Sequence, residues 1–158
     1  MLFLLFQLGG ERYALEASRV VEVLPLLALK QIPQAPRGVA GLFNYRGHPV
    51  PALDLCEFTL GTPCRDLLST RIIVINYTDE NNNPHLLGLI AENATRMFRK
   101  NAEEFSDSGL QIEAAPYLGP VLLDDKGAIQ WVRENRLLPE PLRRTLFSNT
   151  PPITHDGY

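Results

Sequence analysis

The chain has 158 residues and a formal net charge of −3, and 45% of its residues are apolar and 21% charged. That size is sufficient for one compact domain, or two small subdomains, whose core requires no metal or disulfide. The slightly acidic balance argues against the basic footprint of a nucleic-acid-binding protein and against a polybasic membrane-binding patch. The composition therefore predicts an ordinary globular protein without nucleic acid as a partner and without direct membrane insertion.

The apolar N-terminus, residues 1–8, is followed by a glycine pair. It lacks the basic region and small-residue cleavage site of a signal peptide, and it is too short to cross a bilayer. A first β-strand that ends in a tight turn fits it better, so we expect a cytoplasmic protein. The two cysteines, Cys56 and Cys64, are too few for a secreted disulfide framework, and free thiols are expected. A disulfide between them is geometrically possible but less favoured.

Short β runs broken by turn residues are typical of the first part of the chain. Residues 3–8 and 12–15 flank the glycine pair and predict a hairpin. Residues 16–24 carry Val20 and Val23 at helical spacing, which predicts one or two helical turns ending at the proline that follows.

A second hairpin is predicted around Arg46-Gly47, between residues 38–45 and 48–53. Gly47 supplies the positive φ that a tight turn requires. Pro49 and Pro51 lack the N–H groups that a central strand needs, so the second run is expected to be an edge strand or to contain a bulge.

A short helix is predicted next, because Asp54 and Glu57 have the spacing of a capping box and Gly61 is placed to end the helix. The later elements are mostly strands and turns. In chain order they are a strand at 71–77, a loop at 78–84, a partner strand at 85–91, an irregular or single-turn segment at 101–111, a hairpin at 117–132, a helix at 135–147 interrupted by Pro139 and Pro141, and a disordered tail at 148–158.

The sequence lacks the common catalytic signatures. It has no phosphate loop, dinucleotide-binding glycine motif, nucleophile elbow or paired-histidine zinc motif, so no enzyme activity, cofactor or metal is predicted. A hydrolase that pairs Cys56 with His85 has little support, because any chain with a few such residues allows that pairing. A small-ligand or oligosaccharide-binding barrel stays open as an alternative, although such a pocket is usually built from several aromatic side chains and Trp131 is the single tryptophan.

The run from residue 33 to residue 55 resembles the signature of the CheW-like domain family. It contains Pro-Gln-Ala-Pro at 33–36, Gly-Leu-Phe-Asn-Tyr-Arg-Gly at 41–47 and Pro-Ala-Leu-Asp-Leu at 51–55. The Gly-x-x-Asn-x-Arg-Gly pattern with its proline flanks is the most specific part of this resemblance.

Weaker similarities extend the resemblance to roughly residues 2–140. Val-Val-Glu-Val at 20–23 resembles the family's Val-x-Glu-Val element, residues 71–90 resemble a later strand pair, and residues 117–138 resemble the closing hairpin and helix. The resemblance implies an all-β fold of two intertwined, five-stranded SH3-like barrels with short helices and a C-terminal helix, formed by residues 1–147.

The resemblance also implies a function. Members of the family are non-catalytic adaptors that bind the regulatory domain of a CheA-type histidine kinase and the cytoplasmic tip of a methyl-accepting chemoreceptor. A member is expected in the cytoplasm, recruited to membrane-associated receptor arrays. A scaffold that binds the kinase without contacting a receptor is the near alternative.

The receptor-binding positions that the resemblance implies are Val20, Glu22, Gly41 and Arg46. Arg46 at a hairpin tip would offer its guanidinium to a carboxylate or to carbonyl groups. Gly41 would let a partner helix approach the backbone closely, and Val20 would offer apolar surface to that helix. Glu22 could instead form an ion pair within the chain, with Arg46 or Arg37, and so orient the loop.

This chain departs from the family pattern in its second half. The family usually has Val-Asp where Ala91-Glu92 stands, a larger apolar residue at Ala94, and an aspartate where Arg133 stands. The kinase-facing surface is therefore expected to differ from the family more than the receptor-facing one. These changes suggest a divergent adaptor of a surface-sensing or other non-swimming pathway.

Overall fold

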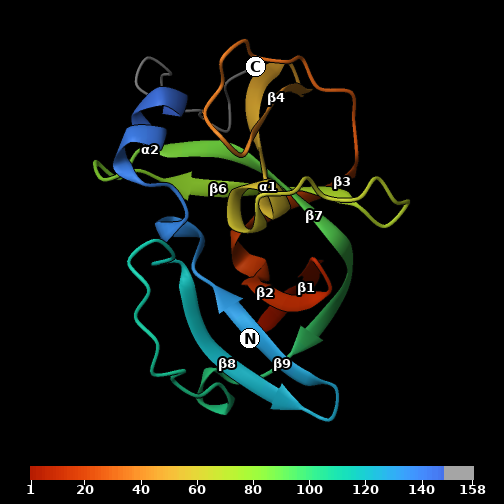
Figure 1. Cartoon of the computed structure of the whole chain (residues 1–158), viewed down its shortest axis with the longest axis vertical. Helices are drawn as coiled ribbons and strands as arrows, with labels where there is room; N and C mark the ends of the chain where they lie inside the picture. Colours follow the sequence, from red (N-terminus) through yellow and green to blue (C-terminus); the bar gives the residue numbers. More distant parts are fainter. Residues whose placement is uncertain (148–158) are drawn as a thin grey trace.

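The structure, a computed structural model, describes residues 1–147 and has mostly β elements (Figure 1). The predicted tail at 148–158 lies outside the described residues. In chain order the elements are β1 (Leu2–Leu8), β2 (Glu11–Glu16), a 3-10 helix (Ala17–Arg19), β3 (Val20–Pro25), β4 (Val39–Tyr45), β5 (His48–Asp54), α1 (Leu55–Leu60), β6 (Arg71–Thr78), β7 (Pro84–Arg99), a 3-10 helix (Ala102–Glu104), β8 (Leu118–Asp124), β9 (Gly127–Val132), a 3-10 helix (Glu134–Arg136) and α2 (Glu140–Phe147).

The strands form two five-stranded units that share β7. One unit has the order β3-β6-β7-β5-β4, and the other has the order β7-β1-β2-β9-β8. The second unit takes strands from both ends of the chain, and β2 pairs with β9 in parallel. In Figure 1 the red β1 and β2 accordingly lie beside the blue β8 and β9. The predicted all-β fold of two intertwined SH3-like barrels is confirmed.

Strand β7 is much longer than the sequence predicted. Its first part pairs with β6 as far as Ala91, and its second part pairs with β1 from Glu92 to Arg99. The predicted end near residue 91 was wrong, because the partner of the second part lies at the other end of the sequence. The change of partner coincides with a register shift, where Asn93 has a φ of 49° and its amide donates to Gln7 Oε1 at 2.7 Å.

The helical turns predicted at 16–24 are also wrong for most of that segment. Ala17–Arg19 forms one 3-10 turn, and the residues after it form β3, which pairs with β6. The register shifts between Val20 and Glu22, so an extra residue bulges out of the strand. This bulge brings Val20 and Val23, three positions apart, against the same core cluster. The bulge thus gives the apolar residues of a strand the three-residue spacing that is typical of a helix.

The hairpin predicted at 38–53 is confirmed as β4 and β5. Strand β5 pairs with β7 over Ala52–Asp54 alone. Pro49 and Pro51 therefore lie where the described structure gives β5 one neighbouring strand, which agrees with the expected edge position. The predicted short helix is confirmed as α1, in which Asp54 Oδ1 accepts the Glu57 N–H at 3.1 Å.

The C-terminal helix begins later than predicted. A 3-10 turn occupies Glu134–Arg136, and α2 starts only at Glu140. Pro139 disfavours helical backbone at the residue before it, whereas Pro141 in the first turn is tolerated because no internal N–H is needed there. Phe147 stacks on His85, with ring centroids 4.4 Å apart, and this contact holds α2 against the barrel that contains β6. None of the helices within residues 1–147 has the length and apolar character needed to span a bilayer.

The largest apolar cluster fills the seam between the two barrels. It gathers side chains from β1, β2, β5, α1, β6, β7, β9 and α2. Leu53 on β5 lies in this cluster and is fully buried. The seam cluster therefore packs elements of both barrels against one another.

Leu53→Ala is expected to lower the free energy of unfolding by about 2–5 kcal/mol, because it leaves a cavity in the seam. Leu123→Ala is the matched control, since Leu123 on β8 is 76% exposed, and it should change the free energy by less than about 0.5 kcal/mol. Urea unfolding followed by circular dichroism would measure both. Equal effects of the two substitutions would contradict the placement of Leu53 in the core.

Candidate functional site

Arg46 lies at the tip of the β4–β5 hairpin. Arg46 and Gly47 both have positive φ values, 51° and 88°, as a two-residue type I′ turn requires. Asn44 Oδ1 accepts the Gly47 N–H at 2.8 Å and stabilises the turn. The Arg46 side chain is 69% exposed. The turn therefore presents a guanidinium to solvent on a rigid support.

Glu22 on β3 orients that guanidinium. Its Oε1 accepts a hydrogen bond from the Tyr45 hydroxyl at 2.7 Å and pairs with Arg46 Nη2 at 3.3 Å. The Arg46 guanidinium also lies 5.3 Å from the centroid of the Tyr45 ring. We call Glu22, Tyr45 and Arg46 the tip cluster. The internal pairing considered for Glu22 is thus present with Arg46, whereas Arg37 donates to the Glu57 carbonyl.

The backbone at Gly41 is not open to close approach by a partner. It is buried, and a side chain there would collide with the carbonyl oxygen of Lys30. Lys30 and Leu42 exchange backbone hydrogen bonds of 2.8 and 2.9 Å across this point. The chain itself therefore occupies the space beside Gly41, and the glycine is needed for internal packing.

Val20 lies just before the bulge in β3, and Val21 is the extra residue within it. Val20 packs partly buried against the seam cluster, while Val21 is 42% exposed. The structure therefore brings Glu22 and Arg46 together, leaves Val20 partly exposed and buries Gly41. Tyr45 was not predicted as part of the site, although its position next to Arg46 in the sequence could have indicated it. Sequence reasoning also missed the exposure of Val21, which depends on the bulge.

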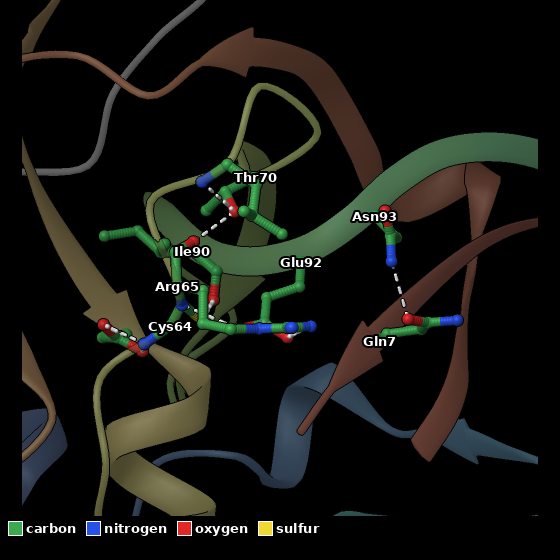
Figure 2. A network of polar contacts seen from close by, with 9 residues as sticks. Gln7, Cys64, Arg65, Thr70, Ile90, Glu92 and Asn93 are labelled. Carbon is green, nitrogen blue, oxygen red and sulfur yellow. Dashed lines mark hydrogen bonds and ion pairs between the residues drawn. The ribbon is translucent and has the colours of Figure 1, made fainter. Parts of the chain in front are cut away.

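Glu92 forms the centre of a second polar arrangement, shown in Figure 2. The Glu92 residue is 2% exposed. It accepts the Arg65 backbone N–H at 2.7 Å and pairs with the Arg65 guanidinium at 3.1 and 3.2 Å. Thr70 donates to the Arg65 carbonyl at 2.5 Å. These contacts fasten the loop at 61–70 to β7 where that strand passes from one barrel to the other.

Most of the departures from the family pattern are therefore interior. Ala91, Glu92 and Ala94 are at most 2% exposed, so none of them offers a surface to a partner. Arg133 is partly exposed, and its guanidinium lies 5.1 Å from the centroid of the Trp131 ring. Of these four positions, Arg133 is the one from which a partner surface can differ.

The catalytic pairing of Cys56 with His85 has no support in the geometry. His85 is buried, its Nε2 lies 2.8 Å from Asp79 Oδ2, and its ring stacks on Phe147. Among residues 1–147, the one group of side chains with ligand atoms close enough to hold a metal ion is Asp54, Cys56 and Cys64.

Gly41→Ala is expected to lower the free energy of unfolding by about 2–4 kcal/mol, because strain at positive φ adds to the collision with Lys30. Gly10→Ala is the matched control: Gly10 also has positive φ, but a side chain there meets no atom within 4 Å, so its cost should stay near 1 kcal/mol. Thermal and urea unfolding would compare them. Equal costs would contradict the close approach of Lys30.

Glu92→Gln is expected to lower the free energy of unfolding at pH 7 by about 1–3 kcal/mol, since it removes a charged acceptor from a buried site. Arg65 holds the pKa of Glu92 below its ordinary value. The carboxylate therefore stabilises the fold above the ordinary glutamate pKa, about 4.3, and this contribution is lost as the pH falls through the lowered pKa.

The difference between wild type and Glu92→Gln should accordingly shrink as the pH falls below about 4.3. Urea unfolding between neutral and acidic pH would measure it. The exposed Glu113 gives the matched control, Glu113→Gln, for which no comparable loss is expected. A difference that stays constant with pH would show that the Glu92 charge does not stabilise the fold.

The chain is similar in sequence to known proteins. The chain is 32% identical to Protein PilI of Pseudomonas aeruginosa over 111 residues, which cover 70% of this chain and 59% of PilI. It is 29% identical to Chemotaxis protein CheW of Helicobacter pylori over 79 residues, which cover 49% of this chain and 47% of that protein. The chain thus matches less than two thirds of the length of either relative.

The solved structure of the scaffolding protein TtCheW from Thermoanaerobacter tengcongensis superposes with a TM-score of 0.77, covering 89% of each chain at 20% identity. At that identity the match shows the SH3-like barrel fold alone. A model of the CheW-like domain matches residues 2–141, nearly all of the described chain. With its fold and its Gly-x-x-Asn-x-Arg-Gly hairpin, this chain belongs to the CheW-like domain family of coupling and scaffold proteins.

Proposed function

We propose that the protein is a non-catalytic adaptor that couples a methyl-accepting chemoreceptor to a CheA-type histidine kinase. It would bind the cytoplasmic tip of the receptor and the regulatory domain of the kinase, and so be recruited from the cytoplasm to a membrane-associated array. Membership of the CheW-like family and the geometry of the tip cluster support this proposal. Such coupling requires no chemistry, because contacts that differ between two receptor states are sufficient to change kinase activity.

The tip cluster is the observation that carries the receptor contact. Arg46 is 69% exposed and is already oriented by Glu22 and Tyr45. A side chain that is oriented before binding loses less conformational entropy when a partner arrives. Its planar fork of donors suits a carboxylate or the carbonyl groups at the end of a partner helix.

The four implied receptor-binding residues take different parts in this proposal. Arg46 would contact the receptor, and Glu22 would position Arg46. Gly41 would fix β4 against Lys30, and Val20 would fix β3 against the seam cluster. The last two would therefore act mainly by fixing the shape of the surface.

We also propose that the protein serves a surface-sensing or other non-swimming pathway, as its departures from the family pattern suggest. Among these departures, Arg133 is the one that would change the surface offered to a partner, because the other three residues are buried. A pull-down with the receptors and kinases of the same genome would identify the pathway. Exclusive binding to the kinase of swimming chemotaxis would contradict this assignment.

Arg46→Glu is expected to weaken receptor binding at least about tenfold, because it reverses the charge at the centre of the proposed contact. Binding to the kinase should stay within about twofold, since the proposed kinase contact lies elsewhere. Fluorescence anisotropy with a receptor-tip fragment and with the kinase regulatory domain would measure both affinities. Stability should change by less than about 1 kcal/mol, because the ion pair to Glu22 is exposed.

Lys126→Glu is the matched control, because Lys126 is an exposed cation in the turn of the other barrel's β8–β9 hairpin. It should leave receptor affinity unchanged. If Arg46→Glu bound the receptor with wild-type affinity, the tip cluster would not be the receptor contact. A wild-type protein that binds the kinase but no receptor would instead favour the kinase-only scaffold.

A further inference from the structure

The two cysteines of the chain meet at the start of α1. Cys56 lies in the first turn of this helix and is 2% exposed, and Cys64 lies in the following loop and is partly exposed. Their sulfurs and a carboxylate oxygen of Asp54 all lie within 4.8 Å of one another. Both cysteines are free thiols in the structure.

Asp54 holds the backbone around both sulfurs. Its carboxylate accepts the Glu57 N–H, which caps α1, and the Cys64 N–H at 3.1 and 3.2 Å. Cys64 is thus held beside the helix while its thiol contacts the Ile90 carbonyl at 3.5 Å. A metal ion is the less favoured occupant, because both oxygens of Asp54 already accept backbone hydrogen bonds.

The sulfurs differ in their tendency to ionise. The interaction between the two sulfurs lowers the pKa of Cys56 and raises the pKa of Cys64, and burial raises the pKa of Cys64 further. Cys56 is thus the member of the pair that ionises more readily. A thiolate beside a thiol is the arrangement from which disulfides form.

We propose that Cys56 and Cys64 form a reversible dithiol–disulfide site that hydrogen peroxide oxidises and small dithiols reduce. A sulfur–sulfur bond is about 2.05 Å long, so from within 4.8 Å the sulfurs must approach by at most about 3 Å. The loop can supply this movement, since Gly61, Thr62 and Pro63 between α1 and Cys64 are all exposed.

The oxidation balances in two steps. The Cys56 thiolate attacks one oxygen of the peroxide, so a sulfur–oxygen bond forms, the oxygen–oxygen bond breaks, and hydroxide leaves and takes up a proton as water. Cys64 then attacks the resulting sulfenic acid, so the sulfur–sulfur bond forms and a second water leaves. Two thiols are oxidised, and one peroxide is reduced to two waters.

The disulfide would tie the loop at 61–70 to α1. Arg65 follows Cys64 directly and pairs with Glu92 on β7, so the oxidised loop would be held from both sides. This inference goes beyond the adaptor function, because the oxidation requires neither a receptor nor a kinase.

Counting free thiols on the native full-length protein tests the proposal. Treatment with hydrogen peroxide should reduce the number of titratable thiols from two to none, and dithiothreitol should restore both. The oxidised protein should be lighter by two hydrogen atoms and remain monomeric on a non-reducing gel.

Mapping the linkage makes the test specific. Trypsin leaves both cysteines in one peptide, residues 47–65, and Glu57 lies between them. Cleavage after Glu57 should therefore separate the reduced peptide into two fragments and leave the oxidised fragments joined. Cys64→Ser, at the partly exposed position, should retain its single thiol or gain oxygen, and its fold can be checked by circular dichroism. Wild-type protein that keeps both thiols, or gains oxygen without a linkage, would overturn the proposal.

Discussion

The buried carboxylate of Glu92 is the constraint that ties the loop at 61–70 to the strand shared by the two barrels. A carboxylate away from water must be paired and hydrogen-bonded, and Arg65 satisfies it with both its backbone and its side chain. Glu92 lies where β7 changes its partner from β6 to β1. The same interaction therefore fastens the loop at 61–70 to β7 at the point where one barrel becomes the other (Figure 2).

The shared strand explains how a small hairpin can serve as a rigid contact. The β4–β5 hairpin packs on a second apolar cluster with β6 and β7, and Leu53 near the end of β5 joins it to the seam cluster. Glu22 reaches the hairpin tip from β3, which is no hydrogen-bonded neighbour of β4 along the sheet. Side-chain contacts thus orient Arg46 before any partner arrives, and this preorganisation is the physical basis of the proposed receptor contact.

The proposed redox site joins the same framework. Asp54 caps α1 and holds Cys64, and the next residue, Arg65, reaches Glu92. One continuous set of contacts therefore runs from α1 through the loop to the centre of β7. A bond between Cys56 and Cys64 would restrain this loop. The tip cluster lies on a different hairpin and would not be linked by that bond.

Residue types alone were enough to predict the hairpin at Arg46-Gly47, the cap at Asp54 and the family to which the chain belongs. Each depends on residues close together in the chain, where turn geometry and capping follow from residue type. Tertiary structure decided the rest. The length of β7, the bulge in β3, the burial of Glu92 and Gly41, and the pairing of Glu22 with Tyr45 and Arg46 all depend on partners distant in sequence. Local patterns carry no information about such partners, so a bulged strand was taken for a helix and an interior carboxylate for part of a surface.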